Sequence, residues 1–320
     1  MKRESVAHFD LVKMQNRRVI RNLLREESPL SVAKAASKAG LSYPTASGLL
    51  KELAETGEAL VSKEQDVAGG RPGICYELNP SYRYALTIYF DDRSLKAVLH
   101  DAFGRQVKRY VMENIDSGIG VWEIIDFIRM IQDEYPTLSA VAIGIPGAVH
   151  GTEIRHLPKF PNLIGSHLAD ALRTELDVDV YIENDTNAIA FAEVGRWEDF
   201  AHIMYVEEDK CIGVGIVLQG EVMKGSNGCA GEMEYLCRNM EDREDTFVTA
   251  ILALTCVLNL PDILISGEFC TEGNVRKIRE KLCDRLPEDR LPEIHVIDDM
   301  TGLYVRGLLR RILAAWSEQM

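Results

Sequence analysis

The stretch IENDTNAIA, residues 182–190, places two carboxylates and two amides where an apolar run gives way to an Ala-rich pattern. Such a change is typical of a strand that ends where a helix begins. A carboxylate at this junction, such as that of Asp185, could act as a general base or hydrogen-bond the hydroxyl groups of a ligand. Asn184 or Asp185 could equally cap the helix by accepting hydrogen bonds from its first backbone N–H groups. The stretch alone leaves both interpretations open.

Further along the chain, GSNGCAGE ends in a second acid, Glu232, that could contribute to the same site. Metal-binding patterns are absent from the sequence. His150, His156, His167 and His202 form no H-x-x-x-H motif, and the seven cysteines form no C-x-x-C pair. We therefore expect no metal and no other cofactor. Reduced thiols in a cytoplasmic protein are the expected state of the cysteines.

The elements that must position these side chains alternate between strand and helix from residue 84 onward. Strand-like runs are expected at residues 84–90, 95–101, 105–113, 140–146, 178–182, 202–208, 212–222 and 262–267. Helical patterns are expected at residues 120–135, 166–176 and 247–260 and at the C-terminus. This alternation predicts an α/β fold in which early antiparallel strands extend a partly parallel sheet. A strand-rich opening near 84–113 and again near 201–223 suggests two related lobes.

The first 80 residues carry a different pattern. Three amphipathic helical segments are followed by two short strand-like runs around DVAGGRPG, which predicts a winged helix-turn-helix. The second helix of such a unit enters the major groove of DNA, and the glycines of the wing let an arginine reach the minor groove. The candidate DNA contacts are Ser42, Tyr43, Thr45, Ser47, Gly48, Lys51, Gly70 and Arg71. A trihelical unit that serves only protein contact is the weaker alternative.

Charge is divided along the chain in the same way. Residues 1–80 hold 12 Lys and Arg against 10 Asp and Glu, whereas the remainder holds 24 against 40. The first segment can approach a polyanion, and the rest would be repelled by one. The N-terminus lacks the apolar core of a signal peptide, and no apolar run approaches the 18 or so residues that a membrane span requires. We therefore expect no membrane partner.

Several motifs in order resemble the ROK family (repressor, open reading frame, kinase), in particular its transcription repressors. Residues 15–57 and GGRPGICYELNP are similar to its helix-turn-helix and wing, and AVAIGIPGAV, PNLIG, YIENDTNAIAFAEVG and GIVLQGEVMKGSNGCAGEMEYL are similar to successive motifs of its sugar-binding domain. The resemblance implies a two-lobed actin-like ATPase (ribonuclease H-like) fold around a cleft. It places a DNA-binding domain at 1–80 and a sensor and dimerisation domain at 81–320, with lobes of about 81–195 and 196–320.

The same resemblance implies the ligand site. Asp185 matches the position of the catalytic base in the sugar kinases of the family. The other predicted sugar contacts are Asn162, Asn184, Glu232 and Tyr235, the last at a position where the family has a histidine. For Asn162 a plain loop residue, and for Tyr235 a packed aromatic, remain alternatives.

Departures from the family argue against phosphoryl transfer, which needs glycine-rich backbone next to the phosphates. The first strand is followed by DDRS with no glycine, and Glu208, Asp209 and Lys210 stand where a second glycine loop is expected. Near Cys237 the usual zinc cluster is absent, and the second lobe is shortened.

The sequence therefore predicts a transcription regulator, a repressor of carbohydrate-related genes. It would bind double-stranded operator DNA as a homodimer or higher oligomer and respond to a sugar or sugar derivative. Two alternatives stay open: a ROK sugar kinase with an appended DNA-binding domain, and a regulator whose sugar site is vestigial.

Overall fold

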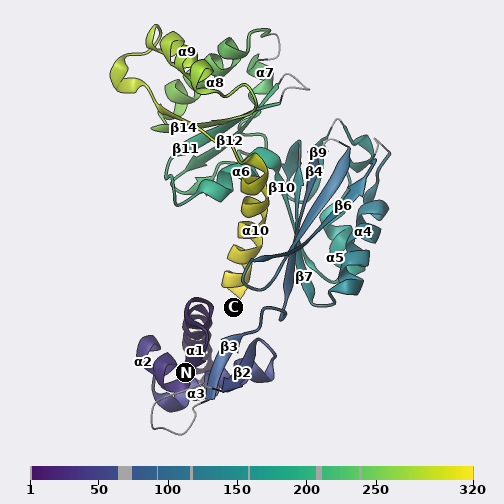
Figure 1. Ribbon diagram of the computed structural model, residues 1–320, viewed down its shortest axis with the longest axis vertical. Coiled ribbons are helices and arrows are strands. Elements are labelled where there is room, and N and C mark those ends of the chain that lie inside the picture. The colour runs from purple at the N-terminus through teal and green to yellow at the C-terminus, as the bar shows by residue number, and fades with distance from the viewer. Residues whose placement is uncertain are drawn as a thin grey trace.

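The computed structural model describes residues 2–63, 74–91, 93–115, 118–157, 159–206, 211–237 and 240–319. It shows an N-terminal unit of three helices and a small sheet, followed by two α/β lobes (Figure 1). Within the described ranges, every helix is too short or too polar to bridge the apolar interior of a lipid bilayer.

The N-terminal unit forms where local signals in the sequence are strong. Ser31 and Ser42 accept hydrogen bonds from the first turns of the two short helices, and Gly40 ends the first of them in a left-handed conformation (φ 65°). The buried side chains of Ile20 and Leu50 join the helices in one core. The elements are α1 (Lys2–Glu27), β1 (Leu30–Ser31), α2 (Val32–Ala39), α3 (Tyr43–Glu55), β2 (Ala59–Lys63) and β3 (Ile74–Leu78).

The sheet of this unit differs from the predicted two-stranded wing. Its strand order is β1-β3-β2, so the short strand β1 adds a third antiparallel member. The wing tip, including the predicted DNA contacts Gly70 and Arg71, lies outside the described residues.

The first lobe is built on a five-stranded sheet of order β10-β7-β4-β5-β6, in which β4, β5 and β6 are antiparallel and β7 and β10 run parallel to β4. Helices α4 and α5 cover its outer face (Figure 1). The elements are β4 (Tyr84–Asp91), β5 (Ser94–His100), β6 (Gln106–Glu113), α4 (Val121–Glu134), β7 (Leu138–Ile145), β8 (Ala148–His150), β9 (Glu153–His156), η1 (Pro161–Leu163), α5 (Leu168–Leu176), β10 (Asp179–Asn184) and α6 (Asp185–Glu193).

The second lobe repeats this arrangement with the order β13-β12-β11-β14-β15, again three antiparallel strands continued by parallel ones. The elements are β11 (Phe200–Val206), β12 (Cys211–Leu218), β13 (Glu221–Val222), α7 (Glu234–Cys237), α8 (Arg243–Leu258), β14 (Asp262–Ser266), α9 (Glu272–Cys283), η2 (Glu288–Arg290), β15 (Glu293–Val296) and α10 (Met300–Gln319).

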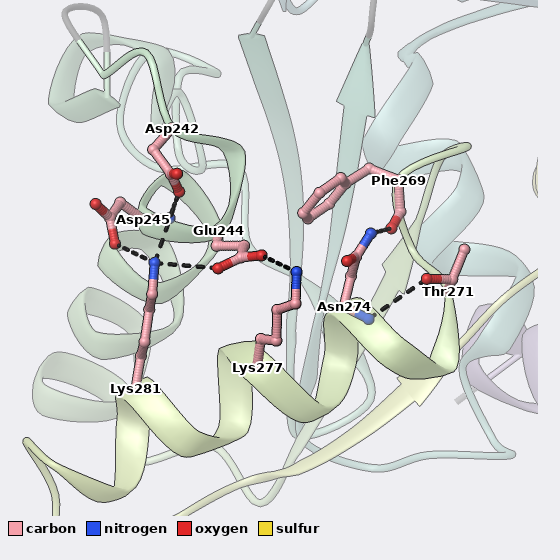
Figure 2. A network of polar contacts seen from close by, with 8 residues as sticks. All are labelled: Asp242, Glu244, Asp245, Phe269, Thr271, Asn274, Lys277 and Lys281. Carbon is pink, nitrogen blue, oxygen red and sulfur yellow. Dashed lines mark hydrogen bonds and ion pairs between the residues drawn. The ribbon is translucent and has the colours of Figure 1, made fainter.

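Polar contacts between α8 and α9 stabilise the outer layer of this lobe (Figure 2). The ammonium group of Lys281 lies 2.9 Å from Asp245 and 3.2 Å from Glu244, and Lys277 reaches Glu244 at 3.0 Å. Thr271 caps α9 by accepting from the backbone N–H of Asn274. The two helices are therefore held together at the surface as well as by their apolar faces.

The last helix lies apart from the sheet that precedes it in the chain. Although α10 follows the second sheet in the sequence, it packs against α6, β7 and β4 of the first lobe and lies between the lobes (Figure 1). Gly307 permits this, because a Cβ there would lie 1.8 Å from the carbonyl oxygen of Ala188. Gly213 and Gly215 of β12 play the same part on the other side of α6, since Cβ atoms there would collide with Thr186.

Candidate functional site

The side-chain amide of Asn184, at the junction of β10 and α6, forms hydrogen bonds with other groups of the protein. Its Oδ1 accepts hydrogen bonds from the backbone N–H of Asn187 (3.0 Å) and from the hydroxyl of Thr186 (2.6 Å). Its Nδ2 donates to the carbonyl oxygen of Gly147 (2.8 Å). These bonds correspond to the capping role that the sequence left open, and the predicted sugar contact of Asn184 remains a prediction.

Asp185 is the first residue of α6, and its environment sets it apart from surface carboxylates. Its Oδ1 accepts a hydrogen bond of 2.7 Å from the backbone N–H of Thr186. Burial raises the pKa of Asp185 to about 7; the hydrogen bond from the backbone N–H of Thr186 opposes this shift, and the negative charge of Glu232 contributes to it. An acid that titrates near neutral pH can accept or donate a hydrogen bond to a hydroxyl group, so Asp185 suits a ligand-binding role.

Glu232 lies in the second lobe and shares this environment. Burial raises its pKa, the charge of Glu234 adds to the effect, and His156 opposes it. His156 lies on β9 of the first lobe, and no motif in the sequence distinguishes it as a site residue. The structure thus brings the two predicted acids together across the lobes and adds an exposed histidine beside them.

The sequence also gave no indication of Tyr304, a buried residue of α10 that reaches the same region. A Cβ on Gly144, at the end of β7, would lie only 2.2 Å from the Oη of Tyr304, so the ring fits only because residue 144 is glycine. The ring packs on Tyr89, with centroids 5.4 Å apart. Burial and the charge of Asp185 raise the pKa of Tyr304 well above its ordinary value. Its Oη has no hydrogen-bond partner within the described part of the chain.

The side chains of the other two predicted contacts, Asn162 and Tyr235, are exposed. Asn162 is exposed in η1, and its Nδ2 donates to the carbonyl oxygen of Gly118 (2.9 Å). The side chain of Tyr235, on α7, is 64% exposed, so the alternative of a packed aromatic does not hold. Whether either residue contacts a ligand remains a prediction.

One ion pair joins the lobes next to this region. Lys224, in the loop after β13, lies 2.5 Å from the carboxylate of Glu183 at the end of β10. Both residues line a hollow with an empty volume of about 440 Å³, partly open to solvent, whose walls also include Phe191, Leu308 and Arg311. Asp185 and Glu232 are not part of its lining.

The structure describes only part of the segments that the resemblance assigns to phosphate binding. Glu208, Asp209 and Lys210 lie outside the described residues. At the β4–β5 turn, Asp91 is paired with Lys96. The described residues contain no group of three or more His, Cys, Asp or Glu side chains arranged to hold a metal ion.

In the N-terminal unit, the predicted DNA contacts gather on one face of α3. Tyr43 is 60% exposed, and Ser42, Thr45, Gly48 and Lys51 are exposed as well, whereas Ser47 is half-buried. The opposite face is formed by Ala46, Leu49, Leu50 and Leu53, all buried. The hydroxyls of Ser42 and Thr45 lie 2.8 Å apart, so the cap and the first turn present adjoining hydrogen-bonding groups.

Comparison with known proteins agrees with the resemblance found in the sequence. Residues 96–243 match the model of the ROK family. The chain is 24% identical over 239 residues to the xylose repressor of Bacillus subtilis, covering 72% of this chain and 62% of that protein. It is 22% identical over 307 residues to the xylose repressor of Caldicellulosiruptor bescii, covering 92% of this chain and 73% of that one.

Solved structures show the same fold. A ROK family transcriptional regulator, a homolog of the Escherichia coli MLC protein, superimposes with a TM-score of 0.64 at 16% identity, over 94% of this chain and 98% of that chain. A ROK hexokinase from Thermus thermophilus superimposes with a TM-score of 0.53 at 16% identity, over 72% and 99%. The chain spans less than two thirds of the Bacillus relative it matches. The match of residues 96–243 to the ROK family model therefore agrees with the resemblance found in the sequence motifs.

Proposed function

We propose that this protein is a DNA-binding transcription regulator, a repressor of carbohydrate-related genes that responds to a sugar or sugar derivative. The observation that carries the proposal is the union, in one chain, of an exposed polar α3 face with a ROK domain whose two lobes bring Asp185 and Glu232 together. Two of the proteins that this chain resembles are named xylose repressors, and their names combine repression with a sugar.

The N-terminal unit, residues 1–80, is proposed as a winged helix-turn-helix. Helix α3 would lie in the major groove, where Thr45 and Ser47 reach base edges or phosphates and Lys51 contacts the backbone. Gly70 and Arg71 are proposed to form the wing contact in the minor groove. Operator half-sites related by two-fold symmetry would require a dimer, so we propose that the ROK domain also dimerises in the cytoplasm.

The effector site is proposed between the lobes. Asp185 and Glu232 would accept hydrogen bonds from sugar hydroxyls, with His156 and the buried Oη of Tyr304 completing the set. Asn162, Asn184 and Tyr235 are proposed as further contacts because of their positions in the family motifs. Sugar binding would change how far the two lobes close. This closure would change the distance between the two N-terminal units of the dimer.

We propose that the protein lacks kinase activity. A base at Asp185 alone is insufficient, because phosphoryl transfer requires backbone close to the phosphates and a bound metal. The rings of Tyr304 and Tyr89 fill the space beside Gly144, next to Asp185. Robust ATP-dependent phosphorylation of a hexose, lost in Asp185→Asn, would establish the kinase alternative instead.

Two measurements on the full chain test the proposal. Fluorescence anisotropy with labelled DNA from upstream of the gene should show binding that weakens at least tenfold in Thr45→Ala and in Arg71→Ala. Lys281→Ala, on the far side of the molecule, should leave the affinity unchanged. Unchanged affinity in both DNA-contact variants would refute the assignment of α3 and the wing.

Thermal-shift screening with neutral sugars and amino sugars tests the sensor. One sugar should stabilise the wild type, and this shift should disappear in Asp185→Asn and Glu232→Gln while DNA binding persists. Operator binding without stabilisation by any sugar would support the vestigial-site alternative.

A further inference from the structure

The region between the lobes carries more negative charge than the described residues neutralise. Asp185 stands at the start of α6, and Glu232 and Glu234 reach the same region from the second lobe. All three side chains are half-buried, so their carboxylates are partly open to solvent. Among the residues that the structure describes, no lysine or arginine forms an ion pair with any of the three.

The basic groups nearest to these acids do not balance them. Lys224 is already paired with a fourth carboxylate, that of Glu183, at 2.5 Å. The exposed imidazole of His156 acts on Glu232 with opposite sign, but one imidazole cannot balance three carboxylates even when it is protonated. The described part of this region is therefore negative overall.

Close backbone contacts hold the acid of the second lobe in its place. A Cβ on Gly228, in the loop before Glu232, would lie 2.1 Å from the carbonyl oxygen of Val149 in β8, so the lobes touch there. A Cβ on Gly231 would lie 2.0 Å from the carbonyl oxygen of Val214 in β12, which anchors the loop to its own sheet. Because both contacts involve backbone, the loop cannot shift to relieve repulsion between the acids while the lobes keep this arrangement.

A buried hydroxyl group lies beside the acid of the first lobe. Tyr304 is 8% exposed, and its Oη has no hydrogen-bond partner within the described part of the chain. The Oη lies against Gly144, whose partner in β10 is Glu183, two residues before Asp185. Besides burial, the charges of Asp185 and Glu183 raise the pKa of Tyr304, so its hydroxyl faces these acids. A buried hydroxyl without a partner costs free energy unless a bound group satisfies it.

We propose that the effector is an amino sugar with a free amine, whose ammonium group binds between Asp185 and Glu232 next to the Oη of Tyr304. The proposal rests on the proposed sugar site and names the class of sugar that the site takes. An ammonium group has three N–H donors and no acceptor, and two carboxylates and one hydroxyl offer it three acceptors. It also supplies the positive charge that these acids lack, whereas a sugar phosphate would be repelled.

The test compares each of three amino sugars with its neutral parent on the full chain without DNA. Calorimetric titrations near pH 7 use glucosamine, mannosamine and galactosamine as hydrochlorides. Glucose, mannose and galactose are titrated with equimolar ammonium chloride, which supplies the same charge and ionic strength on a separate molecule. For at least one pair, the Kd of the amino sugar should be at least tenfold lower than that of the parent. The N-acetylated form of the same sugar, which carries a neutral amide, should lose this advantage.

Two variants separate the charge from the sugar contacts. Glu234→Gln removes a neighbouring charge and should raise the Kd of the amino sugar at least threefold, with little change for the neutral parent. Tyr304→Phe removes only the Oη and should raise the Kd of the amino sugar about fivefold. Its melting temperature should not fall, because this Oη has no partner within the described residues. Glu175→Gln removes the same charge from the exposed surface of α5 and should bind as the wild type does.

The outcomes distinguish this inference from the sugar site on which it rests. Equal Kd values for amino sugars and their parents, with binding lost in Asp185→Asn, would overturn the inference and leave the sugar site in place. Binding of none of these sugars would overturn both. A preference for amino sugars that is unchanged in Glu234→Gln and Tyr304→Phe would place the ammonium group elsewhere and would also overturn the inference.

Discussion

The two lobes share one topology. Each has three antiparallel strands, a helix, a parallel strand, a helix, a second parallel strand and a final helix, so that α6 of the first lobe corresponds to α10 of the second. These two helices pack against each other between the lobes (Figure 1). Polar residues stand at both junctions: Asn184 precedes α6 and Asp185 is its first residue, whereas Asp298 and Asp299 precede α10.

The two junctions differ in how their acidic residues are used. Asp299 is exposed, and its carboxylate accepts a hydrogen bond of 2.8 Å from the backbone N–H of Gly302, so it serves α10 as a cap. In α6 the neighbouring Asn184 caps the helix, which leaves Asp185 to face the buried region near Tyr304 and Glu232. One junction therefore uses an exposed acid as a helix cap, and the other holds an acid in a buried environment.

The largest expected effect concerns the contact between the equivalent helices. Gly307→Ala would place a Cβ 1.8 Å from the backbone oxygen of Ala188, which cannot move independently. Although alanine favours helix by about 1 kcal/mol, overpacking should outweigh it and give a net loss of about 3 kcal/mol in the free energy of unfolding. Urea denaturation measures this loss.

Gly302→Ala in the same helix is the matched control. Its Cβ would meet only the side chain of Asp299, which can rotate away, so the net change should stay within about 1 kcal/mol. Equal losses in the two variants would mean that α6 and α10 do not depend on their close approach.

The next largest expected effect is a pH-dependent change in stability in a variant of Asp185, with Asp299 as the comparison. Because the pKa of Asp185 is raised to about 7 in the folded state, its protonated form stabilises folding at low pH. That contribution is complete below the unfolded pKa near 4 and is lost as the pH rises through 7. Asp185→Asn should therefore match the wild type at pH 4 and exceed it by about 2 kcal/mol at pH 8, a value reduced for partial exposure. Thermal melts at both pH values provide the measurement.

Asp299→Asn should change stability by less than about 0.5 kcal/mol, because asparagine caps helices as well as aspartate does. If Asp185→Asn showed no gain at pH 8, the distinction between a buried and an exposed acid would fail.

The smallest expected change in stability comes from removing a surface ion-pair network in the second lobe. Lys281→Ala removes the contacts with Asp242, Glu244 and Asp245 shown in Figure 2 and should cost less than about 1 kcal/mol, since exposed ion pairs are weak. The cost should shrink further in 1 M salt. A loss above 2 kcal/mol would show that α8 and α9 depend on charge more than the equivalent layer of the first lobe does.

Short-range signals explain what the sequence could predict. The caps Ser31 and Ser42 and the glycine at 40 mark the N-terminal helices, and alternating apolar runs mark the strands of both lobes. The antiparallel opening and the repeated pattern of the lobes are confirmed by the sheet orders. These features depend on residues close together in the chain, which periodicity can detect.

The parts that escaped prediction depend on contacts between distant residues. Tyr304 meets Gly144 across 160 positions, and no spacing rule connects a C-terminal helix with the end of β7. The capping role of Asn184 was one of two open interpretations, because the same amide chemistry serves a helix or a sugar. The strand β1 is only two residues long, too short for an alternating pattern to appear.

Helix α10 also contacts two distant parts of the molecule. Tyr304 near its start lies beside Asp185, and the ring of Trp316, twelve residues later, stacks with the guanidinium of Arg83, which follows the N-terminal unit in the chain. At 1.5 Å per residue these points are about 18 Å apart on a rigid rod. A tilt of about 10° at Tyr304 would displace Trp316 by about 3 Å. The helix would thus convert an adjustment of one side chain into a step comparable with the spacing of base pairs.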